Sequence, residues 1–417
     1  MKGKAAEAKK EDQEIYLDNS ATTRCFDEVA ELMAGIYTKD YGNPSSAHHK
    51  GVVAEQYIRE AKERIAKILR CKPEELYFTS GGTESDNLAV IGAAHANKRS
   101  GMHIVSTQME HPAVRRAMEH LEKEGYEVTY WPVDQDGIVE MNSLENIISG
   151  DTVLVSVMHT NNEIGSVQPI TQIGQWLKRK YPKILFHVDA VQGFGKAVIH
   201  PREMGVDLLS ISGHKIHGPK GIGLLYVSEK AKLEAQNYGG GQQNGLRSGT
   251  ENVPGIAGMA LAAELLEKDM TKELERLFEL KKYFVQELQQ IEGVRINGIP
   301  GMPKKESDAD EAAKDEMLKT AVHASAPHIV SASFEGVRAE VLLHALEEKG
   351  IYVSAGSACA THKPEISETL KAIGLKKDLL DSTLRFSFSV FTTKKELEQT
   401  VSVLKELLPE LRKFTQR

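Results

Sequence analysis

The sequence predicts an α/β protein, with a mostly parallel seven-stranded sheet flanked by helices and a smaller α+β domain. Apolar runs typical of strands occur near 75–79, 103–106, 127–130, 153–157, 184–188, 207–211 and 222–227, and helical patterns separate most of them. This alternation is typical of parallel sheets covered by helices on both faces. A chain of 417 residues is also too long for one simple core, so we expect two domains.

The elements follow in order along the chain. One expected helix presents a single apolar face, formed by Ala54, Tyr57, Ile58, Ala61, Ile65, Ile68 and Leu69. Beyond about residue 255 the pattern changes to a long helical stretch that reaches Gln290. Three further strands are expected near 329–334, 351–354 and 385–390. The polar segment 304–311 is expected to be a solvated loop or surface helix, with partner binding as the alternative.

Composition and charge exclude several classes of protein. The chain has 52 Lys plus Arg against 59 Asp plus Glu and no basic stripe, so no direct nucleic-acid partner is expected. Three widely spaced cysteines, Cys25, Cys71 and Cys359, suit a reducing compartment. No apolar run approaches the ~18 residues needed to cross a bilayer, and the charged N-terminus lacks a signal-peptide core. We therefore expect a cytoplasmic protein with no membrane partner.

The segment 209–221 sets Lys215 at the end of a hydrophobic run, inside a glycine-punctuated turn. A lysine becomes a useful nucleophile when desolvation or a nearby cation lowers its pKa, and it then forms Schiff bases with carbonyls such as that of pyridoxal phosphate. The alternative is a surface lysine in a β-turn. The surrounding motifs favour the reactive lysine.

A buried strand near 184–188 ends on Asp189, and Gln192 follows three residues later. A carboxylate at this position can pair with a pyridinium nitrogen and keep it protonated, which lets the ring act as an electron sink. Taken alone, an aspartate at a strand end is more often a turn or helix cap. Together with Lys215, Asp189 favours a pyridoxal-phosphate site.

Two further turns supply the remaining groups. Gly81, Gly82 and Thr83 follow a strand and open a helix, where small residues and the helix N-terminus favour phosphate. His111 follows the strand near 103–106 and precedes a helix begun by proline, where an imidazole can stack on a flat ring and move protons. A histidine without a catalytic role is the alternative there.

A series of motifs occurs in a fixed order along the chain, at 16–23, 41–46 with His48, 80–87, 161–165, 187–190, 209–221 and 247–250. Together they resemble the class V group of fold type I pyridoxal-phosphate enzymes, and within it the cysteine desulfurases. The resemblance implies a flexible segment 1–14, a segment 15–26 that joins the small domain, a large cofactor-binding domain 27–265, and a small C-terminal domain 266–417 that carries a catalytic cysteine loop.

The resemblance also assigns roles by position. Lys215 would hold pyridoxal 5'-phosphate and act as the base at Cα, Asp189 would pair with the ring nitrogen, and His111 would stack and move protons. Arg385 would bind the substrate carboxylate. Further contacts to the cofactor would come from Gln192, Asn162, Gly82, Thr83, Ser212, Gly213 and His214, with Asn162 also reaching the substrate and Thr250 reaching the phosphate of the neighbouring subunit in a homodimer. No metal is expected.

Cys359 separates desulfurases from aminotransferases. Small residues surround it, so its thiolate could take sulfur from L-cysteine, leave L-alanine and a persulfide, and pass the sulfur on. The expected acceptors are an iron–sulfur scaffold or the thiolation proteins of transfer RNA and thiamine synthesis. A selenocysteine lyase, a class V aminotransferase and a partner-dependent sulfur relay remain as alternatives. Thr361–Pro364, Ser389–Val390 and Gln242–Asn244 depart from the family's usual pattern.

Overall fold

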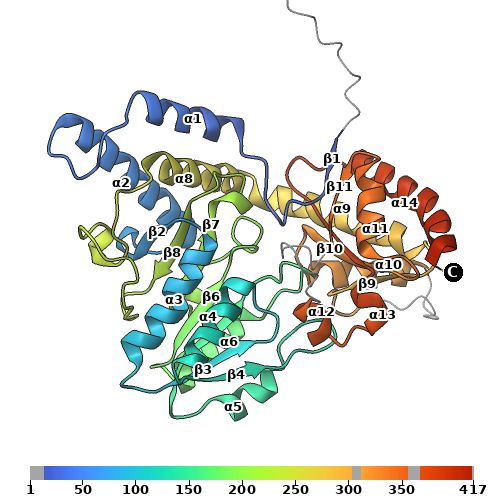
Figure 1. The fold of residues 1–417 in the computed structure, drawn as a ribbon, viewed down its shortest axis with the longest axis horizontal. Helices are drawn as coiled ribbons and strands as arrows, with labels where there is room; N and C mark the ends of the chain where they lie inside the picture. Colours follow the sequence, from blue (N-terminus) through green and yellow to red (C-terminus); the bar gives the residue numbers. More distant parts are fainter. Residues whose placement is uncertain (1–13, 303–310, 356–366, 416–417) are drawn as a thin grey trace, which may run out of the picture.

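The computed structural model describes residues 14–302, 311–355 and 367–415 (Figure 1). The expectations for segments 1–14 and 304–311 fall almost wholly outside these residues. Figure 1 shows the central sheet among the blue-to-green elements and a second group of orange and red elements beside it. Among the described residues, no helix is both long and apolar enough to cross a membrane.

The large sheet has seven strands in the order β2-β8-β7-β6-β5-β3-β4. Its strands are β2 (Leu76–Thr79), β3 (His103–Thr107), β4 (Glu127–Trp131), β5 (Thr152–Met158), β6 (Leu185–Asp189), β7 (Leu208–Ser212) and β8 (Gly223–Val227). Only β8 runs antiparallel to its neighbours. The predicted mostly parallel sheet is therefore confirmed, and so are the approximate positions of its strands.

Helices cover both faces of this sheet. Residues of α2, α6 and α8 pack in one hydrophobic cluster with the sheet, and residues of α3 and α4 pack in another. The predicted apolar face on residues 54–69 is confirmed, because Ala54, Ala61, Ile65 and Leu69 are buried. The helices are α1 (Asp27–Thr38), α2 (His49–Leu69), α3 (Gly82–Asn97), α4 (Pro112–Lys123), α5 (Leu144–Ile147), α6 (Ile170–Lys180), α7 (Pro201–Met204) and α8 (Val253–Lys268), with short turns η1 (Pro73–Glu75), η2 (Met141–Ser143), η3 (Gly213–Lys215) and η4 (Gln243–Gly245).

The C-terminal elements form a four-stranded antiparallel sheet in the order β12-β13-β10-β9. The long helical stretch expected up to Gln290 is confirmed and consists of two helices, α8 and α9, which are separated at Asp269, where the backbone leaves helical geometry. The elements are α9 (Met270–Gln289), β9 (Val294–Asn297), α10 (Glu311–His323), β10 (Ile329–Phe334), α11 (Ala339–Glu347), β11 (Ile351–Tyr352), β12 (Ser354–Ala355), α12 (Glu368–Ala372), α13 (Lys377–Leu380), β13 (Thr383–Ser387) and α14 (Lys394–Thr415).

The last predicted strand, 385–390, is displaced by about two residues in the structure. β13 ends at Ser387, and a turn follows in which the backbone N–H of Ser389 donates to the hydroxyl of Thr392 at 2.9 Å. The N–H of Thr392 in turn donates to the carbonyl of Ser389 at 3.0 Å. This turn ends the strand before Val390.

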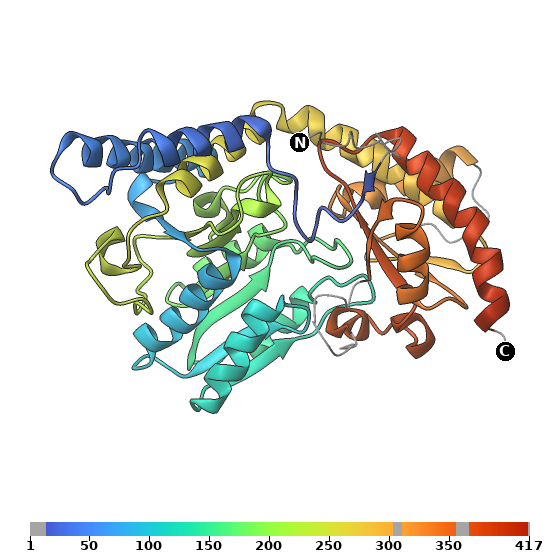
Figure 2. The same ribbon diagram turned by 45° about the horizontal axis from the view of Figure 1, so that its top comes forward.

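The N-terminal segment crosses to the C-terminal elements. β1 (Ile15–Tyr16) pairs in parallel with β11, and Ile15 and Leu17 are fully buried in the C-terminal hydrophobic cluster with Phe386. Figure 2 shows the blue chain leaving β1 and returning toward α1 above the large sheet. Residues 17–26 therefore pass between the two groups of elements.

Candidate functional site

The carboxyl ends of β5, β6 and β7 meet at one cavity of ≈ 260 Å³. Ligands bind at this edge in open α/β sheets, because successive strands deliver their following loops to the same place. The N-terminus of α3, the start of α4, the segment after β1, and β13 complete its wall. Its lining comprises Ser20, Ala21, Gly82, Thr83, Asp86, His111, Met158, Asn162, Asp189, Val191, Gln192, Ser212, His214, Lys215 and Arg385.

Lys215 ends the short turn η3, which follows β7 directly. Its ammonium donates to the backbone carbonyls of Ser20 and Ala21, the latter at 2.8 Å. The backbone carbonyl of Lys215 accepts a hydrogen bond of 2.6 Å from the side-chain nitrogen of Lys196. Burial, and to a lesser extent the charge of Lys215, lowers the pKa of Lys196 to about 7. The turn thus holds the reactive nitrogen inside the cavity, against the N-terminal segment.

Asp189 is the last residue of β6 and is 5% exposed. One carboxylate oxygen accepts from the backbone N–H of Val191 at 2.9 Å, which fixes the side chain in the turn after the strand. Burial raises the pKa of Asp189, while this hydrogen bond and the charge of Lys215 oppose the rise. A cation placed beside Asp189 would favour its ionised form.

Two more buried acids lie near Asp189. Burial raises the pKa of Asp86 well above its usual value, and the charge of Asp189 adds to the effect. Burial also raises the pKa of Glu110 to about 8. One oxygen of each side chain has no hydrogen-bond partner among the described residues. Because neutral carboxyls are far less costly to bury than charged ones, these surroundings favour the acid forms of Asp86 and Glu110.

Both histidines of the cavity are neutral. His111 caps α4, where its Nδ1 accepts from the N–H of Ala113 at 3.1 Å, so the ring carries its proton on Nε2. Burial and then the charge of Lys215 lower the pKa of His111 to about 4. Burial, followed by Lys215 and other cations, also lowers the pKa of His214 to about 4. A neutral imidazole can exchange one proton while it contacts a flat ring.

The N-terminus of α3 forms the end of the cavity suited to an anion. Gly82 and Thr83 open the helix, and their unsatisfied backbone N–H groups favour negative charge. The buried hydroxyl of Ser212 has no hydrogen-bond partner among the described residues. At Gly223, a Cβ would lie 2.5 Å from the carbonyl carbon of Gly81, so glycine is required where β8 passes under this turn.

Arg385 enters from β13 and is 3% exposed. Its Nη1 donates to the carbonyl of Asn162 and its Nη2 to the carboxylate of Asp18, both at 2.8 Å. The amide of Gln192 donates to the carbonyl of Ser20 at 2.9 Å. The guanidinium thus reaches the cavity already oriented by two acceptors.

Most of the predicted site residues meet in this cavity, and two of the described ones, Gly213 and Thr250, do not line it. Gly213 supports the turn, since a Cβ there would lie 2.7 Å from Ile222. Thr250 is exposed and is not among the lining residues. Cys359 lies outside the described residues.

Asp86, Asp18 and the carbonyls of Ser20 and Ala21 were not predicted as site groups from the sequence. Asp86 lies four residues after Gly82 in α3, and this spacing places both on one face of the helix. This spacing could therefore have predicted that Asp86 lies on the same side of α3 as Gly82. The contact of Asp18 with Arg385 joins residues far apart in sequence, and no local pattern predicts it.

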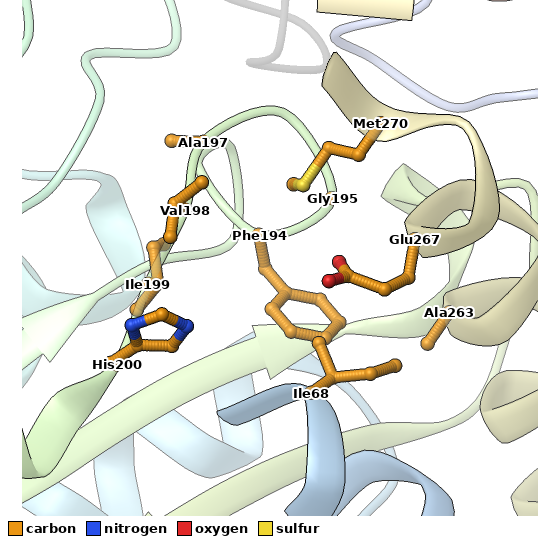
Figure 3. Close-up of a pocket in the computed structure, with 10 residues that line it drawn as sticks. All are labelled: Ile68, Phe194, Gly195, Ala197, Val198, Ile199, His200, Ala263, Glu267 and Met270. Carbon is orange, nitrogen blue, oxygen red and sulfur yellow. The ribbon is translucent and has the colours of Figure 1, made fainter. Parts of the chain in front are cut away.

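Another cavity lies between α2, the loop after β6, and α8 (Figure 3). Figure 3 shows the ring of Phe194 and the carboxylate of Glu267 turned toward one another at its centre. Its volume of ≈ 20 Å³ is about that of one water molecule. It is therefore too small for a cofactor, and the cavity around Lys215 remains the candidate site.

Comparison with known proteins agrees with this geometry. The model of the family described as "Aminotransferase class-V" matches residues 15–310 and 304–400. A cysteine desulfurase IscS of Dictyoglomus turgidum is 41% identical over 96% of both chains. A solved NifS-like protein superposes with a TM-score of 0.85 at 34% identity, covering 96% of this chain and all of its own. A structure titled "SspA in complex with cysteine" has a TM-score of 0.75 at 30% identity, covering 91% of this chain.

A lysine and an aspartate at adjacent strand ends, with a helix N-terminus beside them, define a fold type I enzyme of the pyridoxal-phosphate class. With the matches above, the chain belongs to the class V aminotransferase family and, within it, to the cysteine desulfurases. The resemblance inferred from the sequence motifs is confirmed.

Proposed function

We propose that this chain uses pyridoxal 5'-phosphate to remove sulfur from L-cysteine, giving L-alanine and a persulfide on Cys359. The observation that carries the proposal is the meeting of Lys215, Asp189 and Arg385 in one cavity. An amine, a carboxylate for a ring nitrogen and a guanidinium for a carboxylate are the groups that such a reaction requires. The relative named cysteine desulfurase and the similar structure titled "SspA in complex with cysteine" support the choice of substrate.

The residues present fit the cofactor. Ser212, with its unpartnered buried hydroxyl, would bind phosphate together with Thr83, His214 and the backbone of Gly82. Lys215 would bind the aldehyde carbon and Asp189 the ring nitrogen, with His111 against the ring and Gln192 at the ring oxygen. The bound group would supply an electron sink for negative charge that develops at the substrate Cα.

The chain's own residues would orient the substrate and move its protons. Arg385 would bind the α-carboxylate through paired N–H donors, and Asn162 would contact the substrate beside it. The amine of Lys215 would take the proton from Cα. His111, which is neutral, would carry a proton to or from the reacting atoms.

Cys359 would receive the sulfur. The substrate C–S bond breaks, an S–S bond forms to Cys359, and the substrate carbon takes a proton, so L-cysteine and a thiol become L-alanine and a persulfide. The described residues on either side of 356–366 support this role. Ser354 in β12 pairs with Arg385, and the hydroxyl of Ser367 donates to Glu163 at 2.5 Å. The segment that carries Cys359 therefore begins and ends next to residues that adjoin the cavity.

We further propose a homodimer in which Thr250 binds the phosphate held by the neighbouring subunit. Its exposure and its position outside this chain's own cavity support that assignment. Sulfur would pass from Cys359 to a protein that builds iron–sulfur clusters or thiolates transfer RNA or thiamine precursors. Light scattering on the purified protein tests the dimer.

The function is tested by incubating the cofactor-loaded protein with L-cysteine and a reductant and measuring sulfide and alanine together. We expect equal release of both, lost in Lys215→Ala and in Cys359→Ser. Cys71→Ser is the matched control and keeps activity, because burial raises the pKa of the Cys71 thiol to about 12. Cofactor colour with neither product would contradict the proposal and indicate another class V reaction. Products formed only with an added acceptor would indicate a partner-dependent relay.

A further inference from the structure

Arg385 has a built-in carboxylate partner. Its Nη2 donates to Oδ1 of Asp18 at 2.8 Å, and the two side chains are 4% and 22% exposed. Its Nη1 donates to the carbonyl of Asn162 at 2.8 Å, while Nε has no hydrogen-bond partner among the described residues. A guanidinium has five N–H donors. The two contacts use one N–H of Nη1 and one N–H of Nη2. Nε, Nη1 and Nη2 therefore each keep one N–H that can donate to a second carboxylate.

Asp18 is fixed in place relative to Arg385 by Ser387, which lies two residues further along β13. The N–H of Ser387 donates to the carbonyl of Leu17 at 2.7 Å. The side-chain amide of Asn19 donates to the carbonyl of Ser387 at 2.9 Å, and the N–H of Ser20 donates to its hydroxyl at 2.8 Å. The residues on both sides of Asp18 are therefore bonded to the strand that carries Arg385.

The same segment continues to the reactive lysine. The ammonium of Lys215 donates to the carbonyls of Ser20 and Ala21, two and three residues after Asp18. The hydroxyl of Thr23 then donates to the carbonyl of His214 at 2.8 Å. One stretch of chain thus contacts both the guanidinium and the amine, and it sets their relative position.

We propose that Asp18 is a positioning residue that holds the Arg385 guanidinium in the orientation that receives the α-carboxylate of the substrate. This inference rests on the proposed function for the identity of the substrate. Asp18 leaves paired N–H groups free for bidentate binding, which is the geometry that gives arginine its selectivity for carboxylates. Its negative charge also balances a buried cation, and an unbalanced buried cation is costly.

Two substitutions separate position from charge. Asp18→Asn keeps an amide oxygen that can accept from Nη2 but removes the negative charge. Asp18→Ala removes the acceptor as well, so the carbonyl of Asn162 is the acceptor that remains for the guanidinium among the described residues. Because the charge of Asp18 repels a second carboxylate, Asp18→Asn is expected to bind substrate as well as the wild type or better. Asp18→Ala is expected to bind substrate poorly.

The first test compares steady-state kinetics of the cofactor-loaded variants. In Asp18→Ala we expect KM for L-cysteine to rise at least about tenfold while kcat stays within about threefold. In Asp18→Asn we expect KM at or below the wild-type value. Asp27→Ala, which removes an exposed acid of the same N-terminal region, serves as the control. A wild-type KM in Asp18→Ala, or equal increases in both Asp18 variants, would overturn the proposal.

The second test does not depend on desulfuration. The absorbance change of the bound cofactor is titrated with L-alanine and with ethylamine, which differ only in the carboxylate. Asp18→Ala should weaken the response to L-alanine at least about tenfold and leave that to ethylamine unchanged. Equal weakening of both would show a general disturbance of the site and refute a role through Arg385. If the wild type makes no sulfide, the proposed function fails, whereas this titration still decides the role of Asp18.

Discussion

Replacing Glu110 by glutamine should make the protein more stable in alkaline solution. Glu110 is 7% exposed and accepts hydrogen bonds from the Thr107 hydroxyl at 2.7 Å and the Met158 N–H at 3.0 Å. Burial raises its pKa from 4.5 to about 8. Glutamine has the same shape, keeps the accepting oxygen and cannot ionise.

The sign follows from which form each state prefers. The folded chain holds Glu110 neutral up to about pH 8, whereas the unfolded chain ionises it near pH 4.5. The raised pKa therefore contributes to the free energy of unfolding, and this contribution is present in full below pH 4.5. It is lost as the pH rises from 4.5 to about 8. At 1.36 kcal/mol per pKa unit, the loss amounts to at most about 5 kcal/mol.

The assay is thermal unfolding of wild type and Glu110→Gln at pH 5 and pH 8.5. An unfolding entropy of about 2.1 cal/mol/K per residue converts 5 kcal/mol into about 5 °C for a chain of this length. The quantity to compare is the Tm of the variant minus the Tm of the wild type. This difference should be larger at pH 8.5 than at pH 5 by up to about 5 °C. Glu28→Gln, at an exposed position of α1, controls for the substitution itself. An identical Tm difference at both pH values would refute the reasoning.

Two other predictions concern the glycine beneath the turn before α3 and a buried histidine of β6. Gly223→Ala should displace the turn before α3 and weaken pyridoxal-phosphate binding at least about tenfold in an absorbance titration, while Gly150→Ala, whose Cβ meets nothing within 4 Å, should not. Burial lowers the pKa of His187 to about 3, so its contribution to stability is present above pH 6.5 and lost as the pH falls. His187→Gln should reduce the fall in Tm between pH 6.5 and 4, and an unchanged fall would contradict this.

The strands of the large sheet could be predicted from the sequence because each is a short apolar run between turn residues. Lys215, Asp189 and His111 could be placed for the same reason, since each lies at the end of a strand or within four residues after it. Local signals were weaker in the C-terminal part. The break at Asp269 has no glycine or proline to mark it, and the end of β13 depends on a Ser389–Thr392 turn that sequence periodicity does not show.

Contacts between distant segments could not be predicted in this way. The ion pair of Asp18 with Arg385 depends on the register between the segment after β1 and β13, which Ser387 sets through backbone hydrogen bonds. The grouping of Asp86 and Glu110 near Asp189 likewise requires α3, β6 and the turn before α4 to meet. Such relations are properties of the assembled fold.

The charges around the cavity favour one orientation of a phosphorylated pyridine. The N-terminus of α3 would attract the phosphate, and Arg385 would attract a second anion from the side of β13. Asp189, at the end of β6, offers the negative charge for a ring nitrogen. Burial and the charge of Asp189 raise the pKa of Asp86 and of Glu110, which favours their neutral forms, so Asp189 can ionise with less repulsion from these two neighbours. Neutral Asp86 and Glu110 would leave the negative charge on Asp189, the carboxylate proposed to pair with the ring nitrogen, which is where an electron sink requires it.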